Sequence, residues 1–399
     1  MNRPLTGIRI VDLSTVFSGP IATALLADQG AEVIKVESPE GDTCRMIGPA
    51  KGDLSATFIA ANRGKRSIAI DLKSPAATPV LDALVRRADV LVDNFRPGVM
   101  ARLGLQDERL AALNPRLIRL SITGYGADGP EVDAKVYDAV IQAVSGMAAS
   151  HALPGGPPVM VSSALCDKLT SLAAAQAVTA ALFARERDGR GRRVEVAMLD
   201  AVLAFQWPDA MYNHAFVDEP PPPFPEFGIT QRPWRTADGW VATMNPQQAE
   251  FEAQCRALQR PDLAADPRFA TLRSRNRHGA ELRALLEPLM AERPTDELVA
   301  SFRREGAPIG RVNARGEVLD HPQVRHNQAL VEVDHGDPAQ GGVGRVRLAR
   351  AAARFDGAAL PPAGAAAHLG EHGRAVMAEL GFDDAHVARL VADGVLRLP

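Results

Sequence analysis

Cysteine is scarce in this sequence, with 3 among 399 residues. Cys44, Cys166 and Cys255 form neither a CxxC pair nor a zinc-finger spacing. An odd and sparse set of this kind argues against a disulfide framework and for a reducing compartment. We interpret Cys166 as a small buried thiol, with the alternative that it acts as a nucleophile beside Asp167.

Metal-ligand motifs, long apolar runs and a charge excess are missing as well. The 9 histidines form no HExxH pattern and no other compact cluster, so no metal site is expected. No apolar run approaches the ~20 residues of a membrane span, and the N-terminus lacks the apolar core of a signal peptide. With 45 Lys+Arg against 48 Asp+Glu, the net charge of −3 creates no global field for nucleic acid. We expect a soluble, cytoplasmic protein with neither a nucleic-acid nor a membrane partner.

A dinucleotide fingerprint is absent from a region that otherwise has a suitable pattern. A strand predicted at 8–13 leads into a helix that begins at Ser18 and ends at Gly30, and a second strand follows at 32–37. This order resembles half of a Rossmann unit. The turn contains Gly19 and Pro20 where a GxGxxG loop would bind a pyrophosphate, which disfavours a nucleotide-binding dehydrogenase.

Further strands alternate with helices through the first half of the chain. We expect strands at 67–72, 90–94, 117–122 and 194–198, and a helix at 76–87. This alternation predicts an α/β fold with a doubly wound, parallel, Rossmann-like sheet. Ligands bind such sheets at the carboxyl ends of the strands, and Asn94, Arg96 and Tyr125 follow predicted strands there.

A long helix is predicted directly after Asp167 and ends at Asp188 and Gly189. The apolar residues that follow the i, i+3, i+4 spacing, and that we expect on its buried side, are Leu169, Leu172, Ala173, Ala180 and Phe183. Asp167 has two interpretations: a cap for the helix N-terminus, or an ionised carboxylate that attacks an acyl group. Spacing alone does not separate them.

The second half of the chain has a different composition. Residues 219–226, Glu-Pro-Pro-Pro-Pro-Phe-Pro-Glu, form a stiff connector. A strand at 240–244 and helices at 247–257, 280–287 and 296–304 predict a smaller α+β domain. Strands follow at 330–333 and 343–348, then a loop at 351–367 and a final helix at 372–380. We expect 1–218 to form the first part of the large domain, 227–323 the small domain, and 330–399 a return to the large one.

A set of sequence motifs extends across nearly the whole chain. They include Leu5-Thr-Gly-Ile-Arg-Ile-Val-Asp-Leu-Ser, Leu26-Ala-Asp-Gln-Gly-Ala-Glu-Val-Ile-Lys-Val-Glu, Asn62-Arg-Gly-Lys-Arg-Ser, Asp93-Asn-Phe-Arg-Pro-Gly, Tyr137-Asp-Ala-Val-Ile-Gln-Ala, Gly189-Arg-Gly-Arg-Arg-Val-Glu-Val and Leu369-Gly-Glu-His. Each motif is modest alone, but together, in order and spacing, they resemble class III coenzyme A transferases of the CaiB/BaiF type, including formyl-CoA transferase.

The resemblance implies a CoA-transferase whose nucleophile is Asp167. The enzyme would move CoA from an acyl-CoA donor to a small carboxylic or dicarboxylic acid, through a mixed anhydride and an aspartyl-CoA thioester. CoA would then be a substrate, with no tightly bound cofactor. The positions that match the family's CoA contacts, with the large domain as the CoA-binding one, are Val16, Lys73, Asn94, Arg96, Arg102, Leu103, Lys135, Tyr137 and Met198. The resemblance also implies an interlocked homodimer.

Departures from the family's patterns narrow the reaction. Racemases of the superfamily carry a histidine where this chain has Tyr137, which is too weak a base near neutral pH. A racemase is therefore disfavoured, and an isomerase or a thioesterase-like use of Asp167 stays as the alternative. Without the resemblance, Tyr137 is equally well a half-buried core aromatic, and Lys73 and Arg102 are better read as exposed cations.

The expected glycine-rich lid GGGGQ of formyl-CoA:oxalate transferases is also missing, which puts oxalate in doubt. A shorter loop at 225–233 stands in its place, and Gln231, Arg232 and Arg235 are candidate readers of a carboxylate. Position 38 is Ser where some formyl-CoA transferases carry Arg, so one phosphate contact is either absent or supplied by Arg45.

Overall fold

The computed structural model describes residues 3–153, 155–226 and 232–399. They divide into two compact units, each with its own core. The first unit comprises Met1–Ser145, Ser162–Phe205 and Gln323–Pro399, and the second comprises Gly146–Val161 and Gln206–Pro322. Each unit is described by itself.

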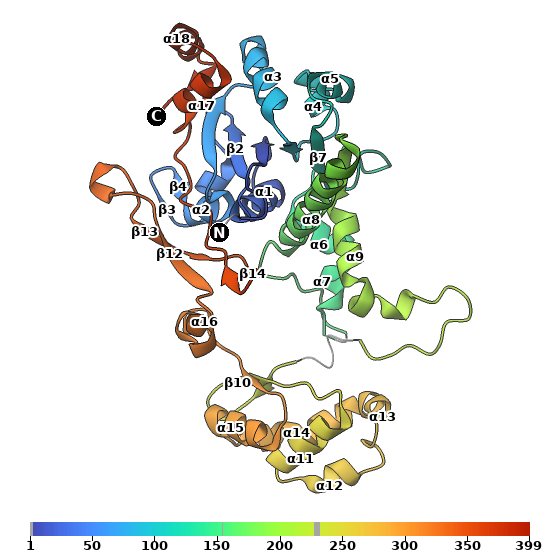
Figure 1. Ribbon diagram of the computed structural model, residues 1–399. Helices are drawn as coiled ribbons and strands as arrows, with labels where there is room; N and C mark the ends of the chain where they lie inside the picture. The colour runs from blue at the N-terminus through green and yellow to red at the C-terminus, as the bar shows by residue number, and fades with distance from the viewer. Residues whose placement is uncertain (1–2, 154, 227–231) are drawn as a thin grey trace. The chain divides into compact units, whose positions relative to one another are not determined.

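The first unit is built on a seven-stranded sheet in the order β16-β5-β2-β1-β6-β7-β8 (Figure 1). All neighbours pair in parallel except β16, which runs antiparallel to β5. The sheet strands are β1 (Arg9–Asp12), β2 (Glu32–Glu37), β5 (Arg66–Ile70), β6 (Val90–Asp93), β7 (Ile118–Thr123), β8 (Arg193–Ala197) and β16 (Leu396–Arg397). The α/β class with a parallel central sheet is confirmed.

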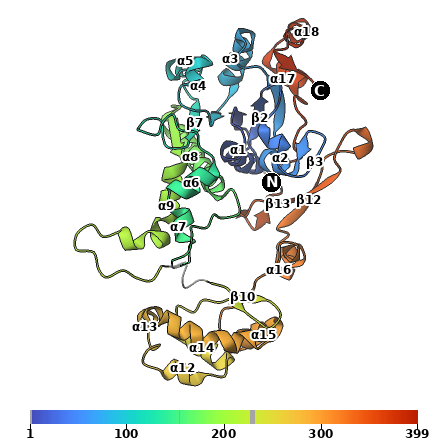
Figure 2. The ribbon, with the colours of Figure 1, turned by 180° about the vertical axis from the view of Figure 1, so that it is seen from behind.

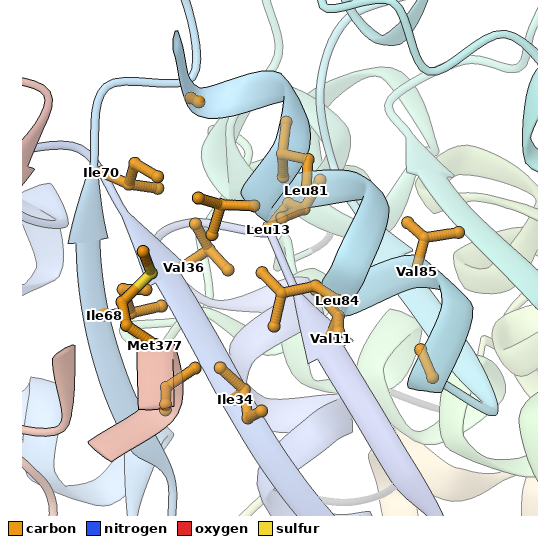
Figure 3. Close-up of a cluster of buried hydrophobic side chains, with 14 of the residues drawn as sticks. Val11, Leu13, Ile34, Val36, Ile68, Ile70, Leu81, Leu84, Val85 and Met377 are labelled. Carbon is orange, nitrogen blue, oxygen red and sulfur yellow. The ribbon is translucent and has the colours of Figure 1, made fainter. Parts of the chain in front are cut away.

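One face of this sheet carries the main hydrophobic core. Alternate residues of β1, β2 and β5, such as Val11, Ile34 and Ile68, point toward α3 (Thr78–Arg87) and α17 (Gly373–Leu380). Figure 3 shows Leu81 and Leu84 of α3 over these strands, with Met377 of α17 beside them. All the core residues named here are at most 2 % exposed, so the core holds this face rigidly.

The opposite face is covered by α1 (Ser18–Asp28) and α8 (Leu165–Asp188), which pack against each other (Figure 1). Asp12 of β1 points to this face, because the Thr23 hydroxyl of α1 donates a 2.6 Å hydrogen bond to its carboxylate. The Ser171 hydroxyl of α8 donates a 2.7 Å hydrogen bond to the carbonyl of Ser18. Helices therefore cover both faces, and the N-termini of α1 and α8 lie close together.

The prediction for the buried side of α8 is wrong. Leu172 is 58 % exposed and Phe183 is 68 % exposed, and Ala180 is exposed with them. The buried side is formed mainly by small and polar residues, with Val178 and Leu182 among them: Cys166, Thr170, Ser171, Ala174, Ala175, Val178, Ala181, Leu182 and Arg185. The physical reason is the close approach of α1, which favours small side chains where the two helices touch.

The C-terminal segment adds more elements to the first unit than expected. The helix at 372–380 is α17, but it is not the final one, because α18 (Asp384–Ala392) and β16 follow it. The hairpin of β12 (Leu330–Asp334) and β13 (Arg345–Ala349) contributes Val343 and Leu348 to a core with Phe58 of α2 (Ala56–Asn62). Figure 2 shows this hairpin beside α2 and β3 from behind.

The other elements of the first unit connect these layers. The expected loop at 351–367 contains a short hairpin of β14 and β15. The remaining elements are β3 (Ala50–Lys51), β4 (Leu54–Ser55), α4 (Val99–Arg102), α5 (Asp107–Leu113), α6 (Asp138–Val144), β14 (Arg354–Phe355), β15 (Ala358–Ala359), α9 (Met198–Ala210), which continues into the second unit, and α16 (Pro322–His326), which begins at its end.

The second unit combines a small antiparallel sheet with helices. Its core contains Phe251, Phe269, Met290, Leu298 and Phe302, all at most 1 % exposed. Its sheet consists of β9 (Trp234–Arg235), β10 (Trp240–Ala242) and β11 (Gly310–Arg311), and its helices are α7 (Met147–Ser150), α11 (Gln248–Ala257), α12 (Pro261–Ala265), α13 (Leu272–Arg277), α14 (Gly279–Ala291) and α15 (Thr295–Glu305).

Candidate active site

A pocket of about 520 Å³ opens at the carboxyl ends of β1, β6, β7 and β8 in the first unit. This is the edge of a parallel sheet where ligands bind. The predicted site residues that line it are Val16, Asn94, Arg96, Arg102, Lys135, Tyr137, Asp167 and Met198. The other two predicted residues lie outside the lining. Lys73 is exposed in the loop after β5, and Leu103 packs against the main core.

Asp167 lies in the first turn of α8 and is not its N-cap. The capping position is Ala164, which makes no side-chain hydrogen bond. The backbone amide of Asp167 donates a 3.0 Å hydrogen bond to Oδ1 of Asp138, so a carboxylate from α6 holds this turn. The Asp167 carboxyl is therefore free of capping work and faces the pocket.

Ser18, in the first turn of α1, lines the same pocket as Asp167. The polar groups of its backbone and side chain favour the ionised form of the Asp167 carboxyl and lower its pKa. Burial acts in the opposite direction and is the largest effect, followed by the negative charge of Asp138. Together they raise the pKa of Asp167 to about 7. Such a carboxylate is more basic than usual, and about half of it is ionised at pH 7.

Three exposed cations surround the pocket. Arg96 follows β6, Arg102 ends α4, and Lys135 lies in the loop before α6. Within the part of the chain that the structure describes, no carboxylate forms an ion pair with any of the three. Unpaired cations that point into one pocket suit a polyanionic ligand.

The alternative contact by Arg45 is excluded by its burial. Its guanidinium forms ion pairs with Glu37 at 2.7 Å and Asp53 at 2.9 Å. It also lies 3.7 Å from the ring centroid of Phe58 and is only 6 % exposed. A phosphate would have to displace both carboxylates, so Arg45 serves the core of this region.

The exposure of Tyr137 and the burial of Cys166 decide between the two interpretations given for each residue. Tyr137 is 70 % exposed and lines the pocket at the N-cap of α6, so it is not a core aromatic. Cys166 is fully buried as expected from the sequence. Burial, followed by the charges of Asp138 and Asp167, raises the pKa of its thiol to about 12, which leaves too little thiolate for a nucleophile.

The sequence reading missed Ser18 and Asp138 as functional residues. Ser18 was interpreted only as a helix start, although its position after a strand also places it at the binding edge. Asp138 directly follows Tyr137, a residue that the resemblance had singled out. Of the candidate carboxylate readers, Arg232 and Arg235 belong to the second unit, and Gln231 lies outside the described residues.

Two negative findings apply to residues 3–153, 155–226 and 232–399. No helix there is long and apolar enough to cross a membrane. No group of three or more His, Cys, Asp or Glu side chains there is arranged to hold a metal ion.

Comparison with known proteins agrees with this geometry. The model of CoA-transferase family III matches residues 5–373. Acetyl-CoA:oxalate CoA-transferase from Acetobacter aceti is 35% identical over 340 residues, which cover 82% of this chain and 86% of that protein. Succinate–glutarate CoA-transferase from Agrobacterium fabrum is 36% identical over 348 residues, which cover 84% and 86%.

A solved structure is similar over nearly the whole length. The crystal structure of a mutant of Rv3272 from Mycobacterium tuberculosis superimposes with a TM-score of 0.83 at 33% identity, covering 94% of this chain and 99% of that one. The family match and these relatives show the family, and this chain belongs to CoA-transferase family III.

Proposed function

We propose that this enzyme moves CoA from an acyl-CoA thioester to a small carboxylic or dicarboxylic acid, with Asp167 as the covalent nucleophile. The observation that carries this proposal is the Asp167 carboxyl in the pocket. It is relieved of capping, lies beside Ser18 in the pocket lining and has a pKa of about 7. About half of such carboxyls are ionised at neutral pH, and the ionised form is more basic than an ordinary aspartate.

The proposed reaction needs no reactant beyond the acyl-CoA donor and the acceptor acid. The Asp167 carboxylate attacks the thioester carbonyl, the C–S bond breaks, and CoA leaves as a thiolate from a mixed anhydride. The thiolate then attacks the Asp167 carbonyl of the anhydride, which releases the donor acid and leaves an aspartyl-CoA thioester. The acceptor carboxylate attacks this thioester, the C–S bond breaks, and a second anhydride forms while CoA leaves again as a thiolate. The thiolate finally attacks the acceptor carbonyl, which yields the new acyl-CoA and restores Asp167.

The pocket supplies what these steps need. The thiolate must stay bound through each anhydride, and Arg96, Arg102 and Lys135 are cations for the phosphates of CoA. Val16, Asn94 and Met198 form walls of the same pocket. We include Lys73 and Leu103 as the outer part of the CoA site, beyond the lining of the cavity.

The acceptor is a small acid in this proposal. The relatives named above are acetyl-CoA:oxalate and succinate–glutarate transferases, so short dicarboxylic acids are the class to test. The missing glycine-rich lid still favours an acid other than oxalate. Arg232 and Arg235 remain candidates to bind the acceptor.

The test is a matrix of acetyl-CoA and succinyl-CoA donors against oxalate, succinate and glutarate, read by mass spectrometry of the acyl-CoA products. We expect transfer to at least one acid, and no transfer by Asp167→Asn. Turnover of one acyl-CoA without any acceptor would support the isomerase or thioesterase alternative. Near-normal transfer by Asp167→Asn would overturn the proposed nucleophile.

We also propose that the enzyme works as an interlocked homodimer in the cytoplasm. The apolar side of α8 supports the dimer, because Leu172 and Phe183 are exposed in a single chain. Phe205 and Trp207 of α9 are exposed as well, and a second copy would cover such residues. Three free, buried cysteines fit a reducing compartment.

A further inference from the structure

The turn between β1 and α1 contains a strained residue. Val16 has φ of 66°, in the left-handed region that a β-branched side chain adopts only at a cost. Such a conformation persists where surrounding contacts over-determine it, and it gathers at functional sites. Val16 lines the pocket, and Ser18, which lowers the pKa of Asp167, lies two residues further on in the same lining.

Side chains from other elements hold the backbone from the Ser14 carbonyl to the Val16 amide. Asn94 accepts a 2.8 Å hydrogen bond from the Thr15 amide and donates one of 2.8 Å to the Thr15 carbonyl. The Val16 amide donates to the Asp42 carboxylate at 3.1 Å. Nζ of Lys35 donates to the Ser14 carbonyl at 2.8 Å. Four consecutive backbone groups are therefore fixed by side chains distant in sequence.

Lys35 and Asp42 form one buried unit behind this turn. Nζ of Lys35 lies 2.9 Å from Oδ2 of Asp42, and their side chains are 1% and 0% exposed. Neither residue lines the pocket, so neither can touch a substrate bound there. Asp42 also accepts a 2.9 Å hydrogen bond from the Cys44 amide. Apart from the ion pair itself, the polar contacts described above join Lys35 and Asp42 to backbone groups at or beside the pocket wall.

We propose that Lys35 and Asp42 are positioning residues for CoA transfer: their buried ion pair holds the strained turn at Val16 and thereby directs the amide of Ser18 at the Asp167 carboxyl. This inference rests on the proposed role of Asp167. It explains why a buried ion pair is kept at a place where two apolar residues would cost less. The Ser18 amide favours the ionised nucleophile, so displacement of the turn disfavours it.

The direction in which the acid limb of kcat/KM moves distinguishes a positioning role of Lys35 and Asp42 from a direct effect of their charges on Asp167. Besides burial, the largest effects on the pKa of Asp167 come from Asp138, Ser18 and Lys168. Loss of the Ser18 contribution raises the pKa of Asp167, so the acid limb of kcat/KM moves to higher pH. Loss of the Asp42 charge by itself would move that limb to lower pH, because a nearby negative charge disfavours ionisation.

The experiment measures kcat/KM for acyl-CoA from pH 5 to 9 in Asp42→Asn and in the pair variant Lys35→Met/Asp42→Asn. The pair variant conserves net charge and removes the unpaired buried Lys, so it folds where the single variant fails. In the pair variant, the side chain at position 42 has one acceptor oxygen for the backbone amides of Val16 and Cys44. The Ser14 carbonyl also loses its donor, Lys35. We expect the acid limb to move up by about one pH unit, with roughly a tenfold loss below the midpoint.

The matched control is Asp28→Asn, at the other end of α1. Asp28 is 0 % exposed and forms a 2.6 Å ion pair with Arg63, so its loss tests the effect of breaking a buried pair. We expect a lower Tm and an unmoved acid limb. An unmoved or lowered limb in the pair variant would overturn the positioning proposal. Activity of Asp167→Asn, measured alongside, would instead overturn the proposed nucleophile on which it rests.

Discussion

Unlike a typical helix of a globular protein, α8 buries its small side chains and exposes large apolar ones. The side against α1 is lined by Ser171, Ala174 and other small residues, whereas the outward side carries Leu172 and Phe183. Small residues let α1 approach, and that approach brings Ser18 to Asp167. The large residues are left for contacts outside the single chain. The comparison teaches that one helix serves catalysis on its compact side and, in our proposal, assembly on its apolar side.

The largest expected effect is on the outward side. Phe183→Glu places a charge in the proposed dimer interface, where burying it unpaired costs ~3 kcal/mol or more, a roughly 100-fold weaker dimer. Light scattering should show dissociation toward the 42.5 kDa chain. Val391→Glu, at a 39 % exposed site on α18, is the control that should leave the dimer intact. A Phe183→Glu variant that stays dimeric, or a wild-type protein that is monomeric, would contradict the proposed role of the apolar side of α8 in assembly.

The compact side is tested by enlarging a buried alanine. Ala174 is 0 % exposed, so Ala174→Leu forces the helices apart and should destabilise the fold by ~1–3 kcal/mol. Ala180 lies on the exposed side of the same helix, and Ala180→Leu should change the free energy of unfolding by less than ~0.5 kcal/mol. Urea unfolding measures both. Equal effects would contradict the assignment of the two sides.

A smaller effect concerns the cations of the pocket. Arg102 lines the cavity without an ion-pair partner in the described chain, so Arg102→Ala should raise the KM for acyl-CoA by about tenfold. Lys73 lies outside the cavity lining, and Lys73→Ala should raise KM by less. Steady-state kinetics at constant ionic strength decides this. Unchanged KM in both variants would remove the cations from the CoA site.

The smallest effect is a pair of opposite pH shifts. Asp167 must be ionised to attack, so activity should rise with pH through about 7. Asp138 raises its pKa and Lys168 lowers it. Asp138→Asn should therefore move the acid limb to lower pH, and Lys168→Met to higher pH, each by less than about one unit. Shifts of the same sign in both variants would show that the limb reports another group.

Much of the first unit could be predicted because its signals are local. Strands such as β2 are rich in β-branched residues (Val33, Ile34 and Val36 among six), and Gly189, with φ of 74°, ends α8 as expected. The buried side of α8 could not be predicted, because apolar periodicity identifies the large residues but not the partner that covers them. The helix α18 was missed although the sequence carries its signals: Gly381 ends α17 in the left-handed conformation, and the side chain of Asp383 caps the start of α18.

The site was predictable where a motif carried it and not where packing created it. Asn94 and Arg96 follow a strand and reach the pocket as expected. The left-handed conformation of Val16 has no signal in the sequence, because β-branched residues normally avoid it. The contact of Ser18 with Asp167 joins two distant segments, and only the packing of α1 on α8 brings it about.

The most direct test of the account is a covalent trap of the nucleophile. The enzyme is incubated with acyl-CoA and hydroxylamine, digested, and examined by peptide mass spectrometry. An acylated or CoA-bound aspartate reacts with hydroxylamine to give a hydroxamate, and the account predicts that this label appears on Asp167 and requires acyl-CoA. An S-acylated Cys166 in a sample digested without hydroxylamine, or an unlabelled Asp167 in an enzyme that turns over, would contradict it.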